Sequence, residues 1–264
     1  MAPGIYSEQS ITRRVNRENV LMLGGGRALL MQLAHPKVAA GVDDYSDFQV
    51  DPLRRLRRTV KLTMAIIFGT QEDAISAART VNQAHARVKG PDYRALDPDL
   101  LLWVHTTLVD STLVTYETFV RSLGPDERDQ FYQESKITGE LLGIPTSKFP
   151  KTHSDLILYM GKLIARGTVK VDDRARSLAK LVLRPPVRLL PGMAMVPMDV
   201  VTAGLLPGPI REQYGLKWGH REQRLWRMAT KAVPKVVRLT PPLLRVWPLP
   251  GHNVKLEAAL RTHG

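Results

Sequence analysis

One predicted helical segment carries side chains that suit an anionic, partly apolar ligand. Arg55, Arg58 and Thr59 are spaced three and four residues apart, so a helix presents them on one face. The same face continues into the apolar residues Leu62 and Ile66. Guanidinium, hydroxyl and aliphatic groups in that order suit a pocket for a molecule with carboxylates at one edge and an apolar plane. The alternative is a solvated basic helix end whose arginine stems lie along the surface.

His85 is the histidine whose surroundings best fit a metal-binding role. It lies four residues after Val81 and three before Val88, on the apolar stripe of a predicted helix. Its neighbours Ala84 and Ala86 are small and leave room for a flat ligand. A neutral imidazole on an apolar helix face is what haem iron requires of an axial ligand. The alternative is a core histidine whose ring is satisfied by protein groups.

Two further histidines stand in apolar helical contexts. His105 follows Trp103 and Val104, and we expect it to be buried and bonded to a backbone carbonyl. His35 precedes Pro36, where we expect its ring to satisfy backbone groups that the proline leaves without partners.

Several other kinds of site lack their signatures. The chain has no cysteine, which excludes disulfides, thiolate metal sites, iron–sulfur clusters and a cysteine nucleophile. It has no Glu-x-x-His motif, which is typical of di-iron bundles, and no His-Glu-x-x-His motif, which is typical of zinc proteases. It also lacks the Gly-x-Ser-x-Gly motif of α/β-hydrolases. Three glycines at 24–26 precede a helix, but no Lys-Ser/Thr pair follows them. We therefore interpret them as a helix break or a close helix contact.

The charge of the chain favours anionic partners. Lys and Arg exceed Asp and Glu by 38 to 25, which gives a net charge of +13. No basic tract interleaved with aromatics is present, so we expect no nucleic-acid partner and favour peripheral contact with anionic membrane. The longest apolar stretch, Gly192 to Leu206, contains Pro197 and Asp199 and is too short to span a bilayer. The first ten residues lack a signal-peptide pattern, so we expect a cytoplasmic protein.

The elements that position these residues are predicted to be helices throughout. Asp51-Pro52 and Asp97-Pro98 each combine a capping carboxylate with a proline suited to the first helical position. We expect one all-α, multi-helix domain over residues 1–264, with residues 1–10 flexible and residues 184–191 a proline-rich connection. The predicted helices cover residues 11–23, 27–40 with a kink at Pro36, 52–68, 71–89, 97–123, 126–142, 152–165, 172–183, 198–205, 219–233 and 252–261.

Four segments of the first half form a recognisable pattern. They are residues 32–42 (QLAHPKVAAGV), residues 51–59 with their Asp-Pro and Arg-Leu-Arg-Arg-Thr runs, residues 85–90 (HARVKG) and residues 97–105 (DPDLLLWVH), with weaker matches at 205–207 and 211–215. Together they resemble the catalytic domain shared by the rubber oxygenases (latex-clearing proteins) and the MpaB-type oxygenase of mycophenolic acid biosynthesis. The resemblance covers about residues 11–220.

The resemblance implies a globin-like core that holds haem b, with its iron bound by the histidine of the helix after the Arg-x-x-Lys/Arg-Thr helix. That residue is His85. In the rubber oxygenases the lysine of this motif can occupy the sixth iron position, whereas this chain has Arg58 there. A guanidinium stays protonated and offers no lone pair, so we infer an open or water-bound sixth position. Arg58 would donate hydrogen bonds to dioxygen or a haem propionate, and Arg55 and Thr59 would position oxygen or water.

The implied function is that of a haem-dependent oxygenase, an oxidoreductase that uses dioxygen on a small hydrophobic substrate of isoprenoid or lipid type. Arg55, Arg58 and Thr59 are the candidate catalytic residues, and His85 is the candidate iron ligand. His105, Arg55 and Arg58 join His85 as candidate cofactor-binding residues, with His105 as the alternative ligand. A non-catalytic haem- or lipid-binding protein at anionic membranes stays open, as does a helical interaction domain without cofactor.

Overall fold

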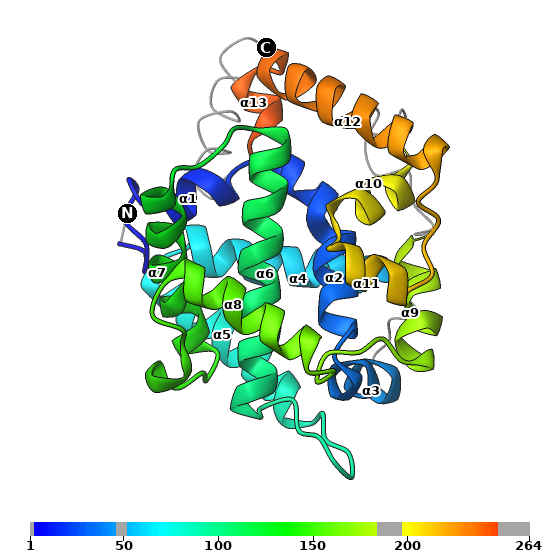
Figure 1. Cartoon of the computed structure of the whole chain (residues 1–264). Coiled ribbons are helices and arrows are strands. Elements are labelled where there is room, and N and C mark those ends of the chain that lie inside the picture. Colours follow the sequence, from blue (N-terminus) through cyan, green and yellow to red (C-terminus); the bar gives the residue numbers. More distant parts are fainter. Residues whose placement is uncertain (1–2, 46–51, 184–196, 248–264) are drawn as a thin grey trace.

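The computed structural model describes residues 3–45, 52–183 and 197–247, and for residues 52–57 it describes the backbone alone (Figure 1). Asp51, which we expected to cap a helix, lies outside the described residues. The predicted connection at 184–191 and the predicted helix at 252–261 also lie outside them.

The described residues form helices and short connections, with no β-strand among them, which confirms the predicted all-α domain. Two of the helical segments, η1 and η3, are 3-10 helices. The elements are α1 (Ile11–Asn16), η1 (Asn19–Gly24), α2 (Gly25–Leu33), α3 (Pro36–Tyr45), α4 (Pro52–Phe68), α5 (Gln71–Ala86), α6 (Pro98–Phe119), α7 (Pro125–Leu141), η3 (Thr146–Lys148), α8 (His153–Ala165), α9 (Asp173–Leu183), α10 (Met198–Leu205), α11 (Gly208–Gln213), α12 (His220–Leu239) and α13 (Pro242–Arg245).

Helix α6 stands at the centre of the fold and packs against η1, α2, α7, α8 and α12 (Figure 1). Asp97 caps it as predicted, because its side chain accepts hydrogen bonds from the backbone N–H groups of Asp99 and Leu100. Most of its residues are buried, as expected of a helix that is apolar on nearly every side. Leu108 is an exception and is 43% exposed.

The glycines at 24–26 mark both a helix break and a close contact. The 3-10 helix η1 ends at Gly24 and α2 begins at Gly25. A Cβ atom on Gly24 would collide with the side chain of Thr115 on α6, and one on Gly26 would collide with Thr202 on α10. The backbone of α2 therefore approaches both helices more closely than a side chain would allow, which confirms the prediction.

A buried ion pair ties α2, α6 and α10 together. Arg27 is 3% exposed, and its Nη2 atom lies 2.6 Å from Oδ2 of Asp110. Its other nitrogens donate to Oγ of Ser111 at 2.6 Å and to the carbonyl oxygen of Leu205 at 2.8 Å. Because a buried charge needs such partners, Arg27 holds three helices in one arrangement.

The last described segment is fixed to the start of the chain. Glu18 is 1% exposed and accepts two hydrogen bonds from the guanidinium of Arg245, at 2.6 and 2.9 Å. The backbone N–H of Trp247 donates to the carbonyl oxygen of Arg17 at 3.0 Å. These hydrogen bonds hold α13 beside η1. Helix α12, which precedes α13, reaches Leu239, beyond the end that we predicted at 233.

The apolar stretch that we considered for membrane contact contributes to the core where it is described. Within α10, Val200, Val201 and Leu205 are buried, and the last two pack in a cluster with Leu23 and Phe119. Among the described helices, none combines the length and apolar character needed to cross a bilayer.

The chain before α1 also contacts the core. Tyr6 is 3% exposed, and its hydroxyl shares a hydrogen bond of 2.6 Å with Thr138 of α7. Tyr6 packs beside Ile67 and Phe68 at the end of α4. The first residues thus support the helix pair that carries most of the candidate site.

Candidate functional site

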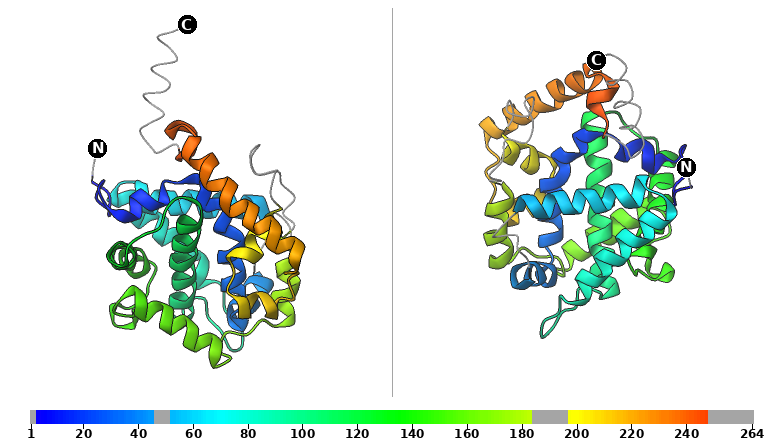
Figure 2. Two further views of the ribbon diagram at one scale, coloured as in Figure 1. Left: turned by 45° about the horizontal axis from the view of Figure 1, so that its top comes forward. Right: turned by 180° about the vertical axis from the view of Figure 1, so that it is seen from behind.

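Helices α4 and α5 form a helical hairpin joined by Gly69 and Thr70. Thr70 caps α5 in a reciprocal pair with Asp73: the Asp73 N–H donates to the Thr70 hydroxyl at 3.1 Å, and the Thr70 N–H donates to the carboxylate at 2.9 Å. This capping box explains why α5 begins at Gln71, as predicted. The two helices pack together at the turn and diverge towards their other ends (Figure 2).

The predicted graded face of α4 is present in the described residues. Arg58 and Thr59 are exposed, Leu62 is half-buried and Ile66 is 5% exposed. The side chains thus change from charged and exposed to apolar and buried over two turns of helix. Arg55 lies in the same helix, one turn before Arg58, but its side chain is outside the described part.

His85 lies in the last turn of α5, on the stripe that includes the buried Ala74 and Ala78 and the half-buried Val81. Its side chain is half-buried, and the Nδ1 atom of its ring is shielded from solvent. Ile75, near the start of the same helix, is 39% exposed. Helix α5 ends at Ala86, four residues before the predicted stop at Gly90.

His105 is enclosed by protein groups. It is 6% exposed, and its ring meets the edge of the Phe149 ring with centroids 5.6 Å apart. Its Nε2 atom lies 3.3 Å from Oγ of Ser135, whose hydroxyl donates to the Tyr132 carbonyl at 2.7 Å. The imidazole is therefore the donor to Ser135. The expected burial is confirmed, but the partner seen is a hydroxyl and not the backbone carbonyl that we predicted.

Burial governs the protonation of His105. Removal from water disfavours the imidazolium and lowers the pKa of His105 from 6.5 to about 4. The space around the ring is filled, because a Cβ atom on Gly139 would already collide with Phe149 and press on the His105 ring. A neutral, fully packed imidazole that donates through Nε2 fits a structural role better than iron ligation.

His35 is the third buried imidazole. It is 9% exposed and lies beside Trp103, with ring centroids 6.4 Å apart. Its Nδ1 atom is buried and has no hydrogen-bond partner among the described residues, so this atom does not make the contact that we predicted for the ring. Burial lowers the pKa of His35, which keeps the ring neutral near pH 7.

A groove follows the outer side of α5, next to the face that carries His85. Its volume is about 390 Å³, and it is shallow and open to solvent. The side chain of Asn82 donates to the Leu141 carbonyl at 3.0 Å, while its buried Oδ1 atom has no partner among the described residues. The groove is lined by Ile75, Ala78, Arg79, Asn82, Gln83, Ala86 and Leu141.

Sequence reasoning missed this groove and its carboxamide. The available signal was the position of Asn82, three residues before His85 on a helix face that otherwise reads as apolar. A mostly apolar groove suits the apolar part of a ligand, whereas the buried Oδ1 atom of Asn82 is shielded from it.

The predicted residues lie on several elements. Arg58 and Thr59 lie in the first half of α4 and His85 in the last turn of α5, away from the turn that joins these two helices, whereas His105 lies between α6 and α7. No three His, Cys, Asp or Glu side chains of the described residues gather as a metal-binding group. His85 thus offers one imidazole, the donor that porphyrin iron takes from a protein.

Comparison with known proteins gives one match. The family model described as ER-bound oxygenase mpaB/B'/Rubber oxygenase, catalytic domain, matches residues 12–235. This range includes the α4–α5 hairpin, the groove and His105. No curated protein and no solved structure matches the chain.

Proposed function

This chain belongs to the family of MpaB and rubber oxygenase catalytic domains, and on that premise we propose that it is a haem b-dependent oxygenase acting with dioxygen on a hydrophobic, isoprenoid or lipid substrate. The family supports an oxidoreductase of the oxygenase kind. The observation that carries the haem assignment is the half-buried imidazole of His85 on a hairpin whose other helix carries exposed Arg58 and Thr59.

The residues of the hairpin fit a haem group. His85 supplies a single imidazole on a stripe of small and apolar side chains, which lets a flat macrocycle approach α5. The face of α4 offers cationic groups at one end and aliphatic groups at the other, in the order that propionates and a porphyrin plane require. A globin-like arrangement of the helices around the group is part of this proposal.

When bound, haem would supply the iron that activates dioxygen. The chain's own residues would bind and orient. His85 would hold the group through one ring nitrogen. Arg58 would donate hydrogen bonds to a carboxylate edge and, because it stays protonated, would not serve as a base. Thr59 would donate and accept through one hydroxyl, which suits the positioning of a water molecule or a substrate oxygen.

The substrate class follows from the surroundings of α5. The groove beside His85 is lined mainly by the aliphatic parts of Ile75, Ala78 and Leu141, so an apolar chain would bury its surface there. A prenyl alcohol or an unsaturated lipid offers such an apolar chain.

Oxygen consumption tests the proposal. Haem-loaded protein incubated with an unsaturated prenyl alcohol is expected to take up dioxygen and form carbonyl products. Arg58→Ala is expected to slow the uptake, whereas Arg166→Ala just after α8, which changes an exposed arginine away from the hairpin, leaves it unchanged. Haem-loaded protein that takes up no dioxygen with prenyl or other unsaturated lipids would contradict catalysis and favour a haem or lipid carrier.

A further inference from the structure

Large apolar side chains are exposed at the end of α12 and on α13. Val236 is 58% exposed, Leu239 82%, Leu243 76% and Leu244 70%, and Met228 lies further along α12 at 57%. Single exposed leucines are ordinary on protein surfaces, but four such residues within nine positions form an apolar patch. We call the surface that these five side chains form, within residues 228–244, the α12–α13 face.

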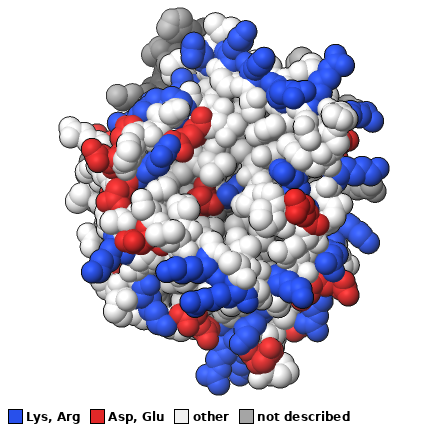
Figure 3. All heavy atoms as spheres, viewed as in Figure 1, with Lys and Arg blue, Asp and Glu red and all other residues white. Residues whose placement is uncertain are grey.

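Basic side chains run along the same helix. Six exposed lysines and arginines follow α12 at intervals of three or four residues, so they form one row. Between residues that the structure describes, none of the six forms an ion pair. In Figure 3 the Lys and Arg side chains gather along the edge where α12 runs in Figure 1. The row consists of Arg221, Arg224, Arg227, Lys231, Lys235 and Arg238.

The helix geometry divides α12 into three stripes. Ala229 and Val237 lie on the buried stripe, which attaches the helix to α10 and α6. Met228, Val236 and Leu239, spaced eight and three residues apart, share the exposed apolar stripe. The basic row lies beside that stripe. An apolar stripe bordered by cations is the arrangement of helices that lie in a membrane interface.

The leucines of α13 are held outward by the core contacts of the same segment. Arg245 is bound to the buried Glu18, and Trp247 pairs with Arg17 through the backbone. Leu243 and Leu244 are exposed although their neighbours are fixed. The apolar patch is thus displayed by a fixed part of the fold.

We propose that the α12–α13 face binds the surface of lipid bilayers that contain anionic lipid. Leu239, Leu243 and Leu244 enter the boundary between headgroups and acyl chains, and the basic row contacts the lipid phosphates. Charge complementarity selects this partner, because six exposed cations beside an apolar patch attract an anionic, amphipathic surface. The net charge of +13 adds attraction at longer range. This inference does not rest on the oxygenase proposal, since it uses no residue of the α4–α5 hairpin.

Vesicle co-sedimentation of the full chain tests the proposal. We expect binding to phosphatidylcholine vesicles that contain phosphatidylserine, weak binding to phosphatidylcholine alone, and loss of binding at high salt. Each basic residue at an anionic surface contributes roughly fivefold to affinity, so Lys231→Glu with Lys235→Glu and Arg238→Glu is expected to weaken binding by about a hundredfold or more. Leu239→Ser with Leu243→Ser is also expected to weaken it.

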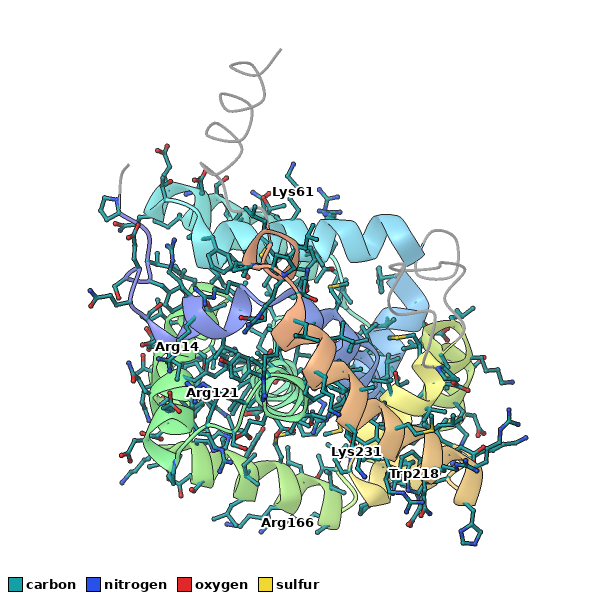
Figure 4. The ribbon with its side chains drawn as sticks, turned by 90° about the horizontal axis from the view of Figure 1, so that it is seen from above. Arg14, Lys61, Arg121, Arg166, Trp218 and Lys231 are labelled. Carbon is teal, nitrogen blue, oxygen red and sulfur yellow. The ribbon has the colours of Figure 1, made fainter. Side chains whose placement is uncertain are left out.

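A matched control lies on α8 and the turn after it. Figure 4 shows Arg166 beside the end of α8 and Lys231 on α12, two helices that lie apart in Figure 1. Lys162, Arg166 and Lys170 are exposed, and Leu158 on α8 is 58% exposed, as Val236 is. Charge reversal of those three basic residues, or Leu158→Ser, is expected to leave vesicle binding within about twofold of the parent, since an exposed residue away from the docking face contributes little. All the variants change exposed side chains, and thermal unfolding checks that each one folds.

Three outcomes would overturn the proposal. They are absence of binding to anionic vesicles, equal binding to neutral and anionic vesicles, and equal loss of binding in the α8 control. Sedimentation velocity provides a fourth test. A dimer that Leu239→Ser dissociates, in a protein that binds no vesicles, would assign the face to a second copy of the chain.

Discussion

The buried state of His105 predicts how the stability of the protein depends on pH. The substitution His105→Gln keeps a neutral N–H donor within reach of Ser135 but removes the titrating group. In the folded protein the pKa of His105 is about 4, whereas in the unfolded chain it is near 6.5. At about 1.4 kcal/mol for each pKa unit, the neutral ring accounts for a pH-dependent difference of about 3 kcal/mol.

The direction follows from proton linkage. Between pH 6.5 and pH 4 the unfolded chain binds a proton at this histidine that the folded protein does not, so the free energy of unfolding falls as the pH falls. The contribution is fully present above pH 6.5 and is lost as the pH falls towards 4. Between pH 7 and pH 5 the loss amounts to about 2 kcal/mol.

Urea unfolding of parent and His105→Gln at pH 7 and pH 5 measures this loss. Other titrating groups contribute to both proteins, so the difference between the two pH-dependences isolates His105. We expect the parent to lose about 2 kcal/mol more than the variant over this interval. Equal losses in both proteins would refute the assignment of His105 as a buried, neutral structural residue.

Two further predictions concern the packing of α2. Arg27→Ala leaves the Asp110 carboxylate buried without its partner. Urea unfolding is expected to show a free energy of unfolding that is lower by about 3–5 kcal/mol. A loss below about 1 kcal/mol would contradict the role of the pair. Gly26→Ala drives a Cβ atom against Thr202 and is expected to lower the free energy of unfolding by about 1–3 kcal/mol. Gly25→Ala, whose Cβ atom meets no atom within 4 Å, is expected to leave the protein equally stable or more stable. A shift in melting temperature of equal size in both variants would contradict the close contact at Gly26.

Helix starts were predictable because their signals are local. Asp97 caps α6 and Asp172 accepts the Ala175 N–H at the start of α9, as the sequence pattern indicates. Where a helix ends or changes type depends on distant contacts. The segment predicted as one helix over residues 11–23 divides into α1 and η1, because Glu18 between them is directed to Arg245, more than 200 residues away.

The same distinction applies to the candidate site. The graded face of α4 was predictable, since spacing alone places Arg58, Thr59 and Ile66 on one side of a helix. The partner of His105 was not, because Ser135 is brought to it by α7 packing on α6. The exposure of Ile75 depends on packing in the same way, because spacing defines the period of a stripe and the neighbouring helices decide which residues at its edge are covered.

The absorption spectrum of purified protein supplied with haem tests the central claim most directly, measured for the parent, His85→Ala and His105→Gln. Haem ligation by His85 predicts a Soret band in the parent that His85→Ala abolishes and His105→Gln retains. A band that persists in His85→Ala and disappears in His105→Gln would contradict the assignment of the ligand. The absence of a band from the parent would contradict haem binding itself.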